Sequence, residues 1–208
     1  MYTGITRGTF EVTRVERKPD LLTYEVELSQ ELAVGLGPGA SVSIDGVCQT
    51  VVSISGNRVT FDAIKETLDL TTLDSLRKGD RVAVERSSRV GDEIGGHDVA
   101  GHVIGTGEVV EVHHEGDVCD LRISVPKNWM KYIFTKGFIA VDGSSMTVGE
   151  TDPAGHFDLH LIPETLRLTN LGKKAPGDRV NIELDARTVA IVDTVERVVE
   201  QHFEREGR

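Results

Sequence analysis

The sequence predicts an all-β protein in which two tandem, six-stranded closed β-barrels are followed by a C-terminal α-helix. Three observations predict this fold: one sequence pattern occurs twice in the 208 residues, each copy contains short β-branched segments between turn residues, and the C-terminal segment carries apolar residues at helical spacing. The length also suits two small domains. We therefore expect a first repeat over residues 1–97, a second repeat over 98–185 and a helix over 186–208.

The duplication rests on four blocks that recur in the same order. Residues 44–51 read Ile-Asp-Gly-Val-Cys-Gln-Thr-Val, and residues 141–148 read Val-Asp-Gly-Ser-Ser-Met-Thr-Val. Ile-Lys-Glu-Thr-Leu is answered by Ile-Pro-Glu-Thr-Leu, and Gly-Asp-Arg-Val occurs twice, followed each time by a glutamate. The further matching positions are Gly4, Gly8, Thr9 and Glu11 with Gly101, Gly105, Thr106 and Glu108, then 64–68 with 162–166, 79–82 with 177–180, and Glu85 with Glu183.

Short strands dominate each copy. In the first copy, segments 42–44, 49–54, 58–61 and 82–85 are β-branched and partly alternating, with Asp-Gly, Gly-Asn and Lys-Gly-Asp turns between them. About six short strands in so few residues favour a closed barrel, which leaves no sheet edge exposed. One helical turn is expected within 126–135.

The C-terminal segment is predicted to be a helix, because residues 186–204 contain neither glycine nor proline. Asp185 stands where an N-cap is expected. The narrow apolar stripe suits docking on the chain's own barrel and docking on copies of the chain equally well. Its members are Ile191, Val192, Val195, Val198, Val199 and Phe203.

Composition excludes several classes of function. The formal net charge of −11 repels phosphate backbones and anionic lipid, so we expect neither nucleic acid nor a membrane as a partner. No apolar stretch reaches the length of a membrane span, and the N-terminus does not resemble a secretion signal. Cys48 and Cys119 are the only cysteines, which is typical of reduced thiols in the cytoplasm.

Comparison of the two copies separates positions with the same residue from positions where the residue differs. Thr50 matches Thr147, and the Glu-Thr pair at 66–67 matches the pair at 164–165. These residues could hold the same kind of ligand twice, or they could form structural hydrogen bonds within each barrel. Cys48 is answered by Ser145, and a thiol that exchanges with a hydroxyl favours a polar, partly solvated position.

Two histidines lie among glycines at the repeat boundary. His97 follows Gly95 and Gly96, and His102 follows Gly101 in the place that Ile5 occupies in the first copy. A histidine there is a candidate proton shuttle, although a loop histidine is often only solvated. Zinc lacks partners at ligand spacing, and no glycine-rich phosphate loop is present, so neither a metal nor a tightly bound cofactor is expected. Asp185 has no acidic counterpart in the first copy, where a serine stands, so it is a further candidate for a role in chemistry. Helix capping is the structural alternative.

In this order the motifs resemble the riboflavin synthase family of the type built from two lumazine-binding barrels. The resemblance runs from Met1 to Phe203 and implies a transferase that works without a cofactor. The implied reaction is the last step of riboflavin biosynthesis, the dismutation of two 6,7-dimethyl-8-ribityllumazine molecules to riboflavin and 5-amino-6-(D-ribitylamino)uracil. The resemblance also implies a homotrimer held by the C-terminal helices, with each site between the first barrel of one subunit and the second barrel of its neighbour; lumazine synthase is a candidate partner. Its most specific motifs are the Met-aromatic-Thr-Gly start at 1–4, then 46–51, 95–97 with 101–102, 136–137, 142–148 and 161–166.

The resemblance assigns residue roles as well. His102 is the first candidate for moving the 7-methyl proton, Asp185 would orient or balance it, and Lys136 would favour anionic ring oxygens. The implied catalytic residues are His102, Cys48, Ser145, Thr147, Asp185 and Lys136. The implied substrate-binding residues are Gly4, Ile5, Thr6, Ser41, Cys48, Gln49, Thr50, Asp62, Ala63, Ile64, Lys65, Glu66, Thr67, His97, Gly101, His102, Val103, Lys136, Ser145, Met146, Thr147, Leu161, Ile162, Pro163, Glu164 and Thr165.

Two positions depart from the family pattern. Tyr2 stands where the family usually has phenylalanine, and its hydroxyl needs a partner. Gln49 stands where the family usually has an aliphatic residue, so its side chain points away from the core or its amide is satisfied inside. The rival function is a non-catalytic lumazine- or flavin-binding antenna, and the paired histidines favour the enzyme. A purely structural barrel would leave the differences between the repeats unexplained.

Overall fold

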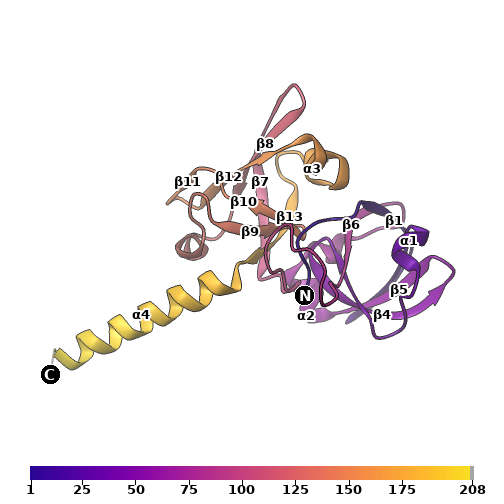
Figure 1. The fold of residues 1–208 in the computed structure, drawn as a ribbon, viewed down its shortest axis with the longest axis horizontal. Coiled ribbons are helices and arrows are strands. Elements are labelled where there is room, and N and C mark those ends of the chain that lie inside the picture. Colours follow the sequence, from indigo (N-terminus) through magenta and orange to yellow (C-terminus); the bar gives the residue numbers. More distant parts are fainter. Residues whose placement is uncertain (207–208) are drawn as a thin grey trace.

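The structure is a computed structural model that describes residues 1–206, and it places two β-rich repeats side by side with a long C-terminal helix (Figure 1). The all-β class, the duplication and the helix are confirmed. Residues 207–208, which the expected helix included, lie outside the described residues.

The first repeat is a closed antiparallel barrel with the strand order β1-β2-β5-β4-β3-β6. The four strand segments expected from the sequence fall within β3 to β6. β1 and β2 were not expected: the register of β1 shifts between Val12 and Arg14, which interrupts its alternation, whereas the regular alternation of β2 was an available signal. The strands are β1 (Thr9–Lys18), β2 (Leu21–Glu27), β3 (Ser41–Ile44), β4 (Val47–Ser55), β5 (Arg58–Ile64) and β6 (Arg81–Arg86). The short helices are α1 (Gln30–Ala33), α2 (Lys65–Leu70) and the 3₁₀ helix η1 (Thr72–Ser75).

The second repeat keeps this order but corrects the expectation of a second closed, six-stranded ring. Its strands form a seven-stranded sheet in the order β10-β9-β13-β7-β8-β12-β11. The strands are β7 (Gly105–Glu115), β8 (Val118–Ser124), β9 (Phe138–Val141), β10 (Ser144–Thr147), β11 (Thr151–Asp152), β12 (His156–Leu161) and β13 (Arg179–Leu184). The 3₁₀ helices η2 (Lys127–Tyr132) and η3 (Leu171–Lys173) and helix α3 (Pro163–Leu168) complete the repeat, and η2 confirms the helical turn expected within 126–135.

The difference between the repeats arises where β4 has a bulge. In the first repeat the register shifts between Val51 and Ser53, yet β4 continues. In the second repeat the corresponding strand is divided into β10 and β11 around Gly149. A Cβ on Gly149 would lie 2.8 Å from the His160 imidazole, and glycine weakens a strand interior. Two backbone hydrogen bonds still link the divided strand to β12. The Gly149 N–H donates to the Asp158 carbonyl at 2.8 Å, and the Asp158 N–H donates to the Glu150 carbonyl at 2.9 Å.

Side chains fill the interior of each repeat, so the candidate ligand surface lies outside the barrels. Along β4, Val47, Gln49 and Val51 are buried, whereas Cys48 and Thr50 face the other way. The second repeat repeats this alternation along β10, and its core includes Met146. The positions that the sequence singled out as Cys48 and Ser145 are therefore half-buried on the outer faces.

The repeats meet at their two Asp-Gly turns. Asp45 and Asp142 have φ values of 44° and 45°, and Gly46 and Gly143 follow with 84° and 79°, as in a type I′ hairpin turn. A Cβ on Gly46 would lie 2.5 Å from the backbone nitrogen of Gly143, so only glycine allows this approach. The Asn181 side chain joins the repeats by donating to the Asp45 carbonyl at 2.7 Å.

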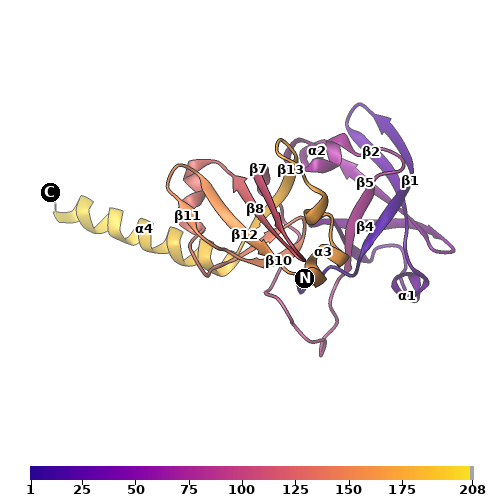
Figure 2. The ribbon, with the colours of Figure 1, turned by 90° about the horizontal axis from the view of Figure 1, so that it is seen from above.

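Helix α4 (Ala186–Glu206) begins at the end of the second repeat and extends away from both repeats (Figures 1 and 2). Its start is capped by Asp185, whose Oδ2 accepts bonds from the backbone N–H and the hydroxyl of Thr188 at 2.8 and 2.7 Å. Val189 packs against the core of the second repeat. Among the described residues, no helix combines the length and hydropathy needed to cross a membrane. The exposed apolar residues of α4 are Ile191, Val195, Val198, Val199 and Phe203.

Candidate active site

The first segment of each repeat crosses onto the outer face of the other repeat. The Gly4 carbonyl accepts a bond from the backbone N–H of Ser145 at 2.8 Å, and the Gly101 carbonyl accepts one from that of Cys48 at 2.9 Å. A Cβ on either glycine would lie within 2.6 Å of the facing Cβ, and both glycines have positive φ. Gly4 and Gly101 therefore bring backbone against Ser145 and Cys48, respectively.

Two buried carboxylates hold the crossing segments. Glu85 accepts bonds from the backbone N–H groups of Thr3 and Gly4 at 2.7 and 3.0 Å, and Glu183 accepts from those of Ala100 and Gly101 at 2.6 and 2.9 Å. Burial raises the pKa of both carboxyls, although these hydrogen bonds work in the opposite direction. Neither glutamate was an expected site residue, but their occurrence at matching positions in the repeats was an available signal.

A cavity of about 320 Å³ opens on the outer face of the first repeat. It brings together expected residues from both repeats, because β4 and α2 meet the crossing segment after Gly101 there. The His102 side chain is exposed at this cavity. The residues lining the cavity are Val47, Cys48, Glu66, Thr67, Leu70, Thr71, Gly101, His102 and Val103.

A second polar group lies on the outer face of the second repeat. His97 Nδ1 lies 2.7 Å from Ser145 Oγ, and the imidazole stacks on Phe138 with ring centroids 5.2 Å apart. Burial lowers the pKa of His97, and the negative charges of Asp185 and Asp98 oppose this shift. A neutral imidazole can exchange a proton with the serine hydroxyl.

Two carboxylates interact with the two histidines within one chain. Within one chain, Asp185 interacts electrostatically with His97 rather than with His102. Burial works to raise the pKa of Asp185, but the Thr188 hydrogen bonds and the nearby His97 outweigh it and lower that pKa. Glu183 is the carboxylate that accepts a hydrogen bond from the backbone N–H of His102. This bond and the electrostatic interaction with His102 both work to lower the pKa of Glu183, against its burial.

Other expected binding residues fall into three groups. The interior group, which turns its side chains into the barrels and offers only backbone to a ligand, is Gln49, Ala63, Met146 and Leu161. The exposed group is Thr50, Asp62, Ile64, Lys65, Lys136, Thr147, Ile162, Pro163 and Glu164. Ile5, Ser41 and Thr165 are half-buried, and buried Thr6 lies with its Oγ1 2.8 Å from Ser144 Oγ.

Several exposed residues are already engaged within the chain. Lys65 forms an ion pair with Asp69, and Glu164 forms one with Arg167. Lys136 adopts a φ of 68° and donates its backbone N–H to Val148. The side chains of Lys136 and Thr147 are exposed, and Thr147 lies on the same face of β10 as Ser145.

The two departures from the family pattern both have partners. The Tyr2 hydroxyl donates to Cys48 Sγ at 3.1 Å. The Gln49 amide is satisfied inside the first barrel, where its Oε1 accepts from the Tyr24 hydroxyl at 3.2 Å. Tyr2 was a residue that sequence reasoning left out of the site, although its departure from phenylalanine marked it.

Comparison with known proteins finds relatives over nearly the whole chain. The family model described as "Lumazine binding domain" matches residues 3–87 and 100–185. The riboflavin synthase of Escherichia coli (strain K12) is 49% identical over 200 residues, covering 96% of this chain and 93% of that protein. The riboflavin synthase of Buchnera aphidicola subsp. Baizongia pistaciae (strain Bp) is 41% identical over 203 residues, covering 97% and 95%. A crystal structure of LumP complexed with riboflavin superposes with a TM-score of 0.83 at 25% identity, covering 89% of this chain and all of that chain.

Proposed function

The chain belongs to the riboflavin synthase family, and from this premise we propose that it transfers a four-carbon unit between two molecules of 6,7-dimethyl-8-ribityllumazine, giving riboflavin and 5-amino-6-(D-ribitylamino)uracil. The observation that carries the proposal is the pair of related but unequal outer faces, one built on Cys48 and one on Ser145. Two like substrates need two like pockets, and donor and acceptor chemistry requires that the pockets differ. The antenna alternative is not favoured, because the curated relatives are synthases.

The site residues would have two kinds of role: some position the two substrates, and one transfers a proton. The crossing segments and the Glu-Thr pairs would hold ring edges and ribityl hydroxyls, largely through backbone groups. Holding two rings face to face converts a bimolecular encounter into an oriented one, worth up to about 7–11 kcal/mol. His102, exposed at the cavity of the first repeat, would remove the acidic 7-methyl proton of one lumazine, while C7 of the other lumazine becomes the electrophilic centre.

The complete site would form between subunits of a homotrimer. Ile64 and Ile162, next to the two Glu-Thr pairs, are 56% and 58% exposed and would be covered by ligand or by a neighbouring subunit. The apolar stripe of α4 supports the assembly, since most of it is uncovered within one chain. We also place the protein in the cytoplasm, because both of its cysteines are free. Lumazine synthase is a candidate partner that co-elution would test.

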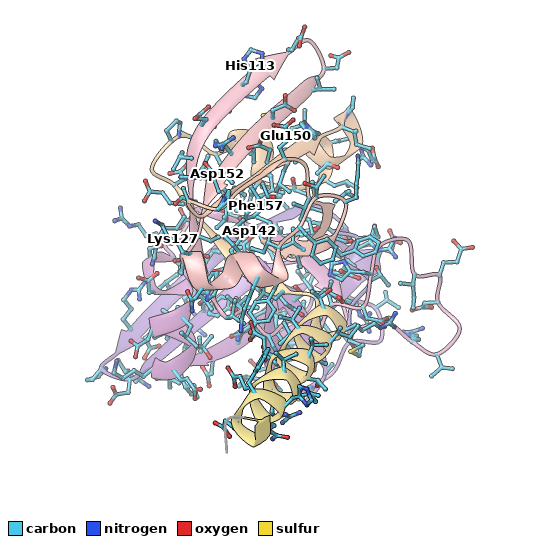
Figure 3. The ribbon with its side chains drawn as sticks, turned by 90° about the vertical axis from the view of Figure 1, so that its left-hand side faces the viewer. His113, Lys127, Asp142, Glu150, Asp152 and Phe157 are labelled. Atoms are coloured by element: carbon cyan, nitrogen blue, oxygen red, sulfur yellow. The ribbon has the colours of Figure 1, made fainter. Side chains whose placement is uncertain are left out.

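The test is turnover of the lumazine without added metal or cofactor. The purified protein should form one riboflavin for every two lumazines, measured by flavin absorbance. His102→Gln should keep lumazine binding, measured by fluorescence titration, and should slow turnover at least about tenfold through loss of a general base. His113→Gln is the matched control, because Figure 3 shows His113 at the far end of the β7–β8 hairpin.

Two results would contradict the proposal. Lumazine fluorescence that persists without new flavin absorbance would identify a binding protein instead of an enzyme. Undiminished turnover in His102→Gln would remove His102 from the mechanism while leaving the reaction in place.

A further inference from the structure

Three polar atoms of Cys48 have partners in the first repeat or its crossing segments. The backbone N–H donates to Gly101 at 2.9 Å, the carbonyl accepts from Gln49 Nε2 at 3.1 Å, and the sulfur accepts from the Tyr2 hydroxyl at 3.1 Å. Cys48 also lines the cavity on the outer face. Backbone and side chain of this residue are therefore both held where a ligand would meet them.

Tyr2 is fixed independently of Cys48. Its side chain is 2% exposed and packs with Val99 and Ala140, and its backbone exchanges two hydrogen bonds with Val99 at 2.7 and 3.1 Å. Its ring lies close enough to Gly101 that a Cβ there would be 3.0 Å away. Burial raises the pKa of Tyr2 well above its ordinary value, so the phenol keeps its proton and acts as the donor.

Gln49 is fixed by a second buried phenol. The Gln49 side chain is 4% exposed, and Tyr24, whose hydroxyl donates to Gln49 Oε1, is fully buried. Because the amide oxygen accepts from Tyr24, the amide nitrogen is turned toward the Cys48 carbonyl. Tyr24 is in turn held against Phe61, with ring centroids 5.5 Å apart.

The second repeat has no equivalent network. Leu121 and Met146 occupy the positions of Tyr24 and Gln49, and Val99 occupies that of Tyr2, so none of them offers a side-chain donor. Ser145 instead has the His97 imidazole beside its hydroxyl. The network is therefore a property of the first repeat alone.

We propose that Tyr2 and Gln49 are positioning residues that hold Cys48 in one orientation against the lumazine ring bound in the cavity of the first repeat. Tyr2 occupies a lone pair of the sulfur and leaves the S–H hydrogen to point elsewhere, and Gln49 anchors the backbone of the same residue. The inference rests on the proposed function for the identity of the ring, whereas the hydrogen bonds of the network are contacts within the chain alone.

The first experiment compares Tyr2→Phe and Gln49→Met, the latter introducing the residue of the second repeat. Each variant should lower kcat about three- to tenfold, as expected for one hydrogen bond, with KM changed less than about twofold. In a Cys48→Ala background the same substitutions should have no further effect on kcat, because the side chain whose orientation they fix is gone, although the backbone carbonyl that Gln49 contacts remains. An equal fold-effect in both backgrounds would overturn the proposal and leave a merely structural role.

The second experiment needs neither substrate nor turnover. The S–H stretching band of Cys48, identified in infrared spectra as the band lost in Cys48→Ala, should shift in Tyr2→Phe and stay in place in the control Tyr132→Phe. An unshifted band in Tyr2→Phe would overturn the role of Tyr2. A shifted band in a protein that makes no riboflavin would support the network while refuting the proposed function.

Gln49→Met leaves the Tyr24 hydroxyl unpaired in the core, which lowers stability on its own. The double variant Tyr24→Phe with Gln49→Met removes both polar groups and keeps the barrel apolar. The double variant should regain the unfolding temperature of the unmodified protein, while its kcat should stay as low as that of Gln49→Met. Recovery of kcat together with stability would show that Gln49 acts only through folding.

Discussion

At the scale of single residues, Cys48 and Ser145 show how a duplicated position acquires two chemistries. Both backbones donate to a glycine carbonyl of the opposite repeat, at 2.9 and 2.8 Å. Their side chains meet different groups: a phenol that donates to sulfur in one repeat, and an imidazole beside a hydroxyl in the other. The difference comes from Tyr2 and His97, residues outside the strands that carry Cys48 and Ser145.

His97 predicts a pH dependence of stability. Its folded pKa is lowered below 6.5, mainly by burial, so the stability it contributes is present above pH 6.5 and is lost as the pH falls toward the folded pKa. His97 therefore works to lower the unfolding free energy between about pH 7 and pH 5, and the unmodified protein should lose more stability over this interval, or gain less, than His97→Gln. Urea denaturation at both pH values measures this, and equal changes in the two proteins would contradict it. Asp185 titrates below 3.8, outside this window.

At the scale of elements, α4 is a 21-residue helix that one chain covers only near its start. Tyr132 donates to Asp193 at 2.5 Å, and Lys131 pairs with Glu196, which fixes the direction in which the helix leaves the barrel. Beyond these contacts the apolar stripe is exposed. An isolated helix of this kind gains most of its stability from packing, so the stripe needs a covering surface.

Charges placed in the stripe should dissociate the assembly. Val195→Glu with Val198→Glu puts two carboxylates where copies of α4 would meet, and we expect a folded monomer with turnover reduced at least about tenfold, since the neighbour's half of each site is lost. Sedimentation gives the mass, and Glu200→Gln on the opposite face is the control. A double variant that sediments like the unmodified protein would exclude α4 as the interface.

At the scale of the whole molecule, the repeats meet around two carboxylates, one buried and one half-buried. Asp142 is 2% exposed and forms an ion pair with Lys174 at 3.0 Å. Asp45 accepts the backbone N–H of Ala83 at 2.6 Å and borders an open cavity of about 660 Å³ between the repeats. Burial and the neighbouring negative charge of Asp142 raise the pKa of Asp45.

Neutralising Asp45 and neutralising Asp142 should change the free energy of unfolding in opposite directions. Because the folded pKa of Asp45 lies above 3.8, its contribution is fully present below that pH and is lost as the pH rises through the folded pKa. Asp45→Asn should therefore stabilise the protein more at pH 8 than at pH 5. Asp142→Asn should destabilise it by about 3 kcal/mol, because Lys174 loses its partner. Thermal and urea unfolding test both, and a stabilising Asp142→Asn would refute the account.

The sequence predicted some of the residues that meet at the cavity, but it did not predict which way every side chain faces. Cys48, Glu66, Thr67 and His102 were expected at the site and do share a cavity, since the repeat marked them as equivalent or changed positions. Gln49 was expected to bind substrate, but its side chain lies in the barrel. A strand pattern shows that neighbours face opposite ways, but it does not show which face a satisfied amide occupies.

The sequence by itself determined the duplication, the all-β class, the C-terminal helix and the polar positions that differ between the repeats, because these depend on local spacing and internal comparison. Only the tertiary structure decided that the first segments cross between repeats, that Asp185 lies by His97, and that β10 and β11 are divided. The reason is sequence separation: Tyr2 and Cys48 are 46 positions apart, and His97 and Ser145 are 48 apart. Local periodicity cannot specify contacts at such separations; the closing and docking of the barrels create them.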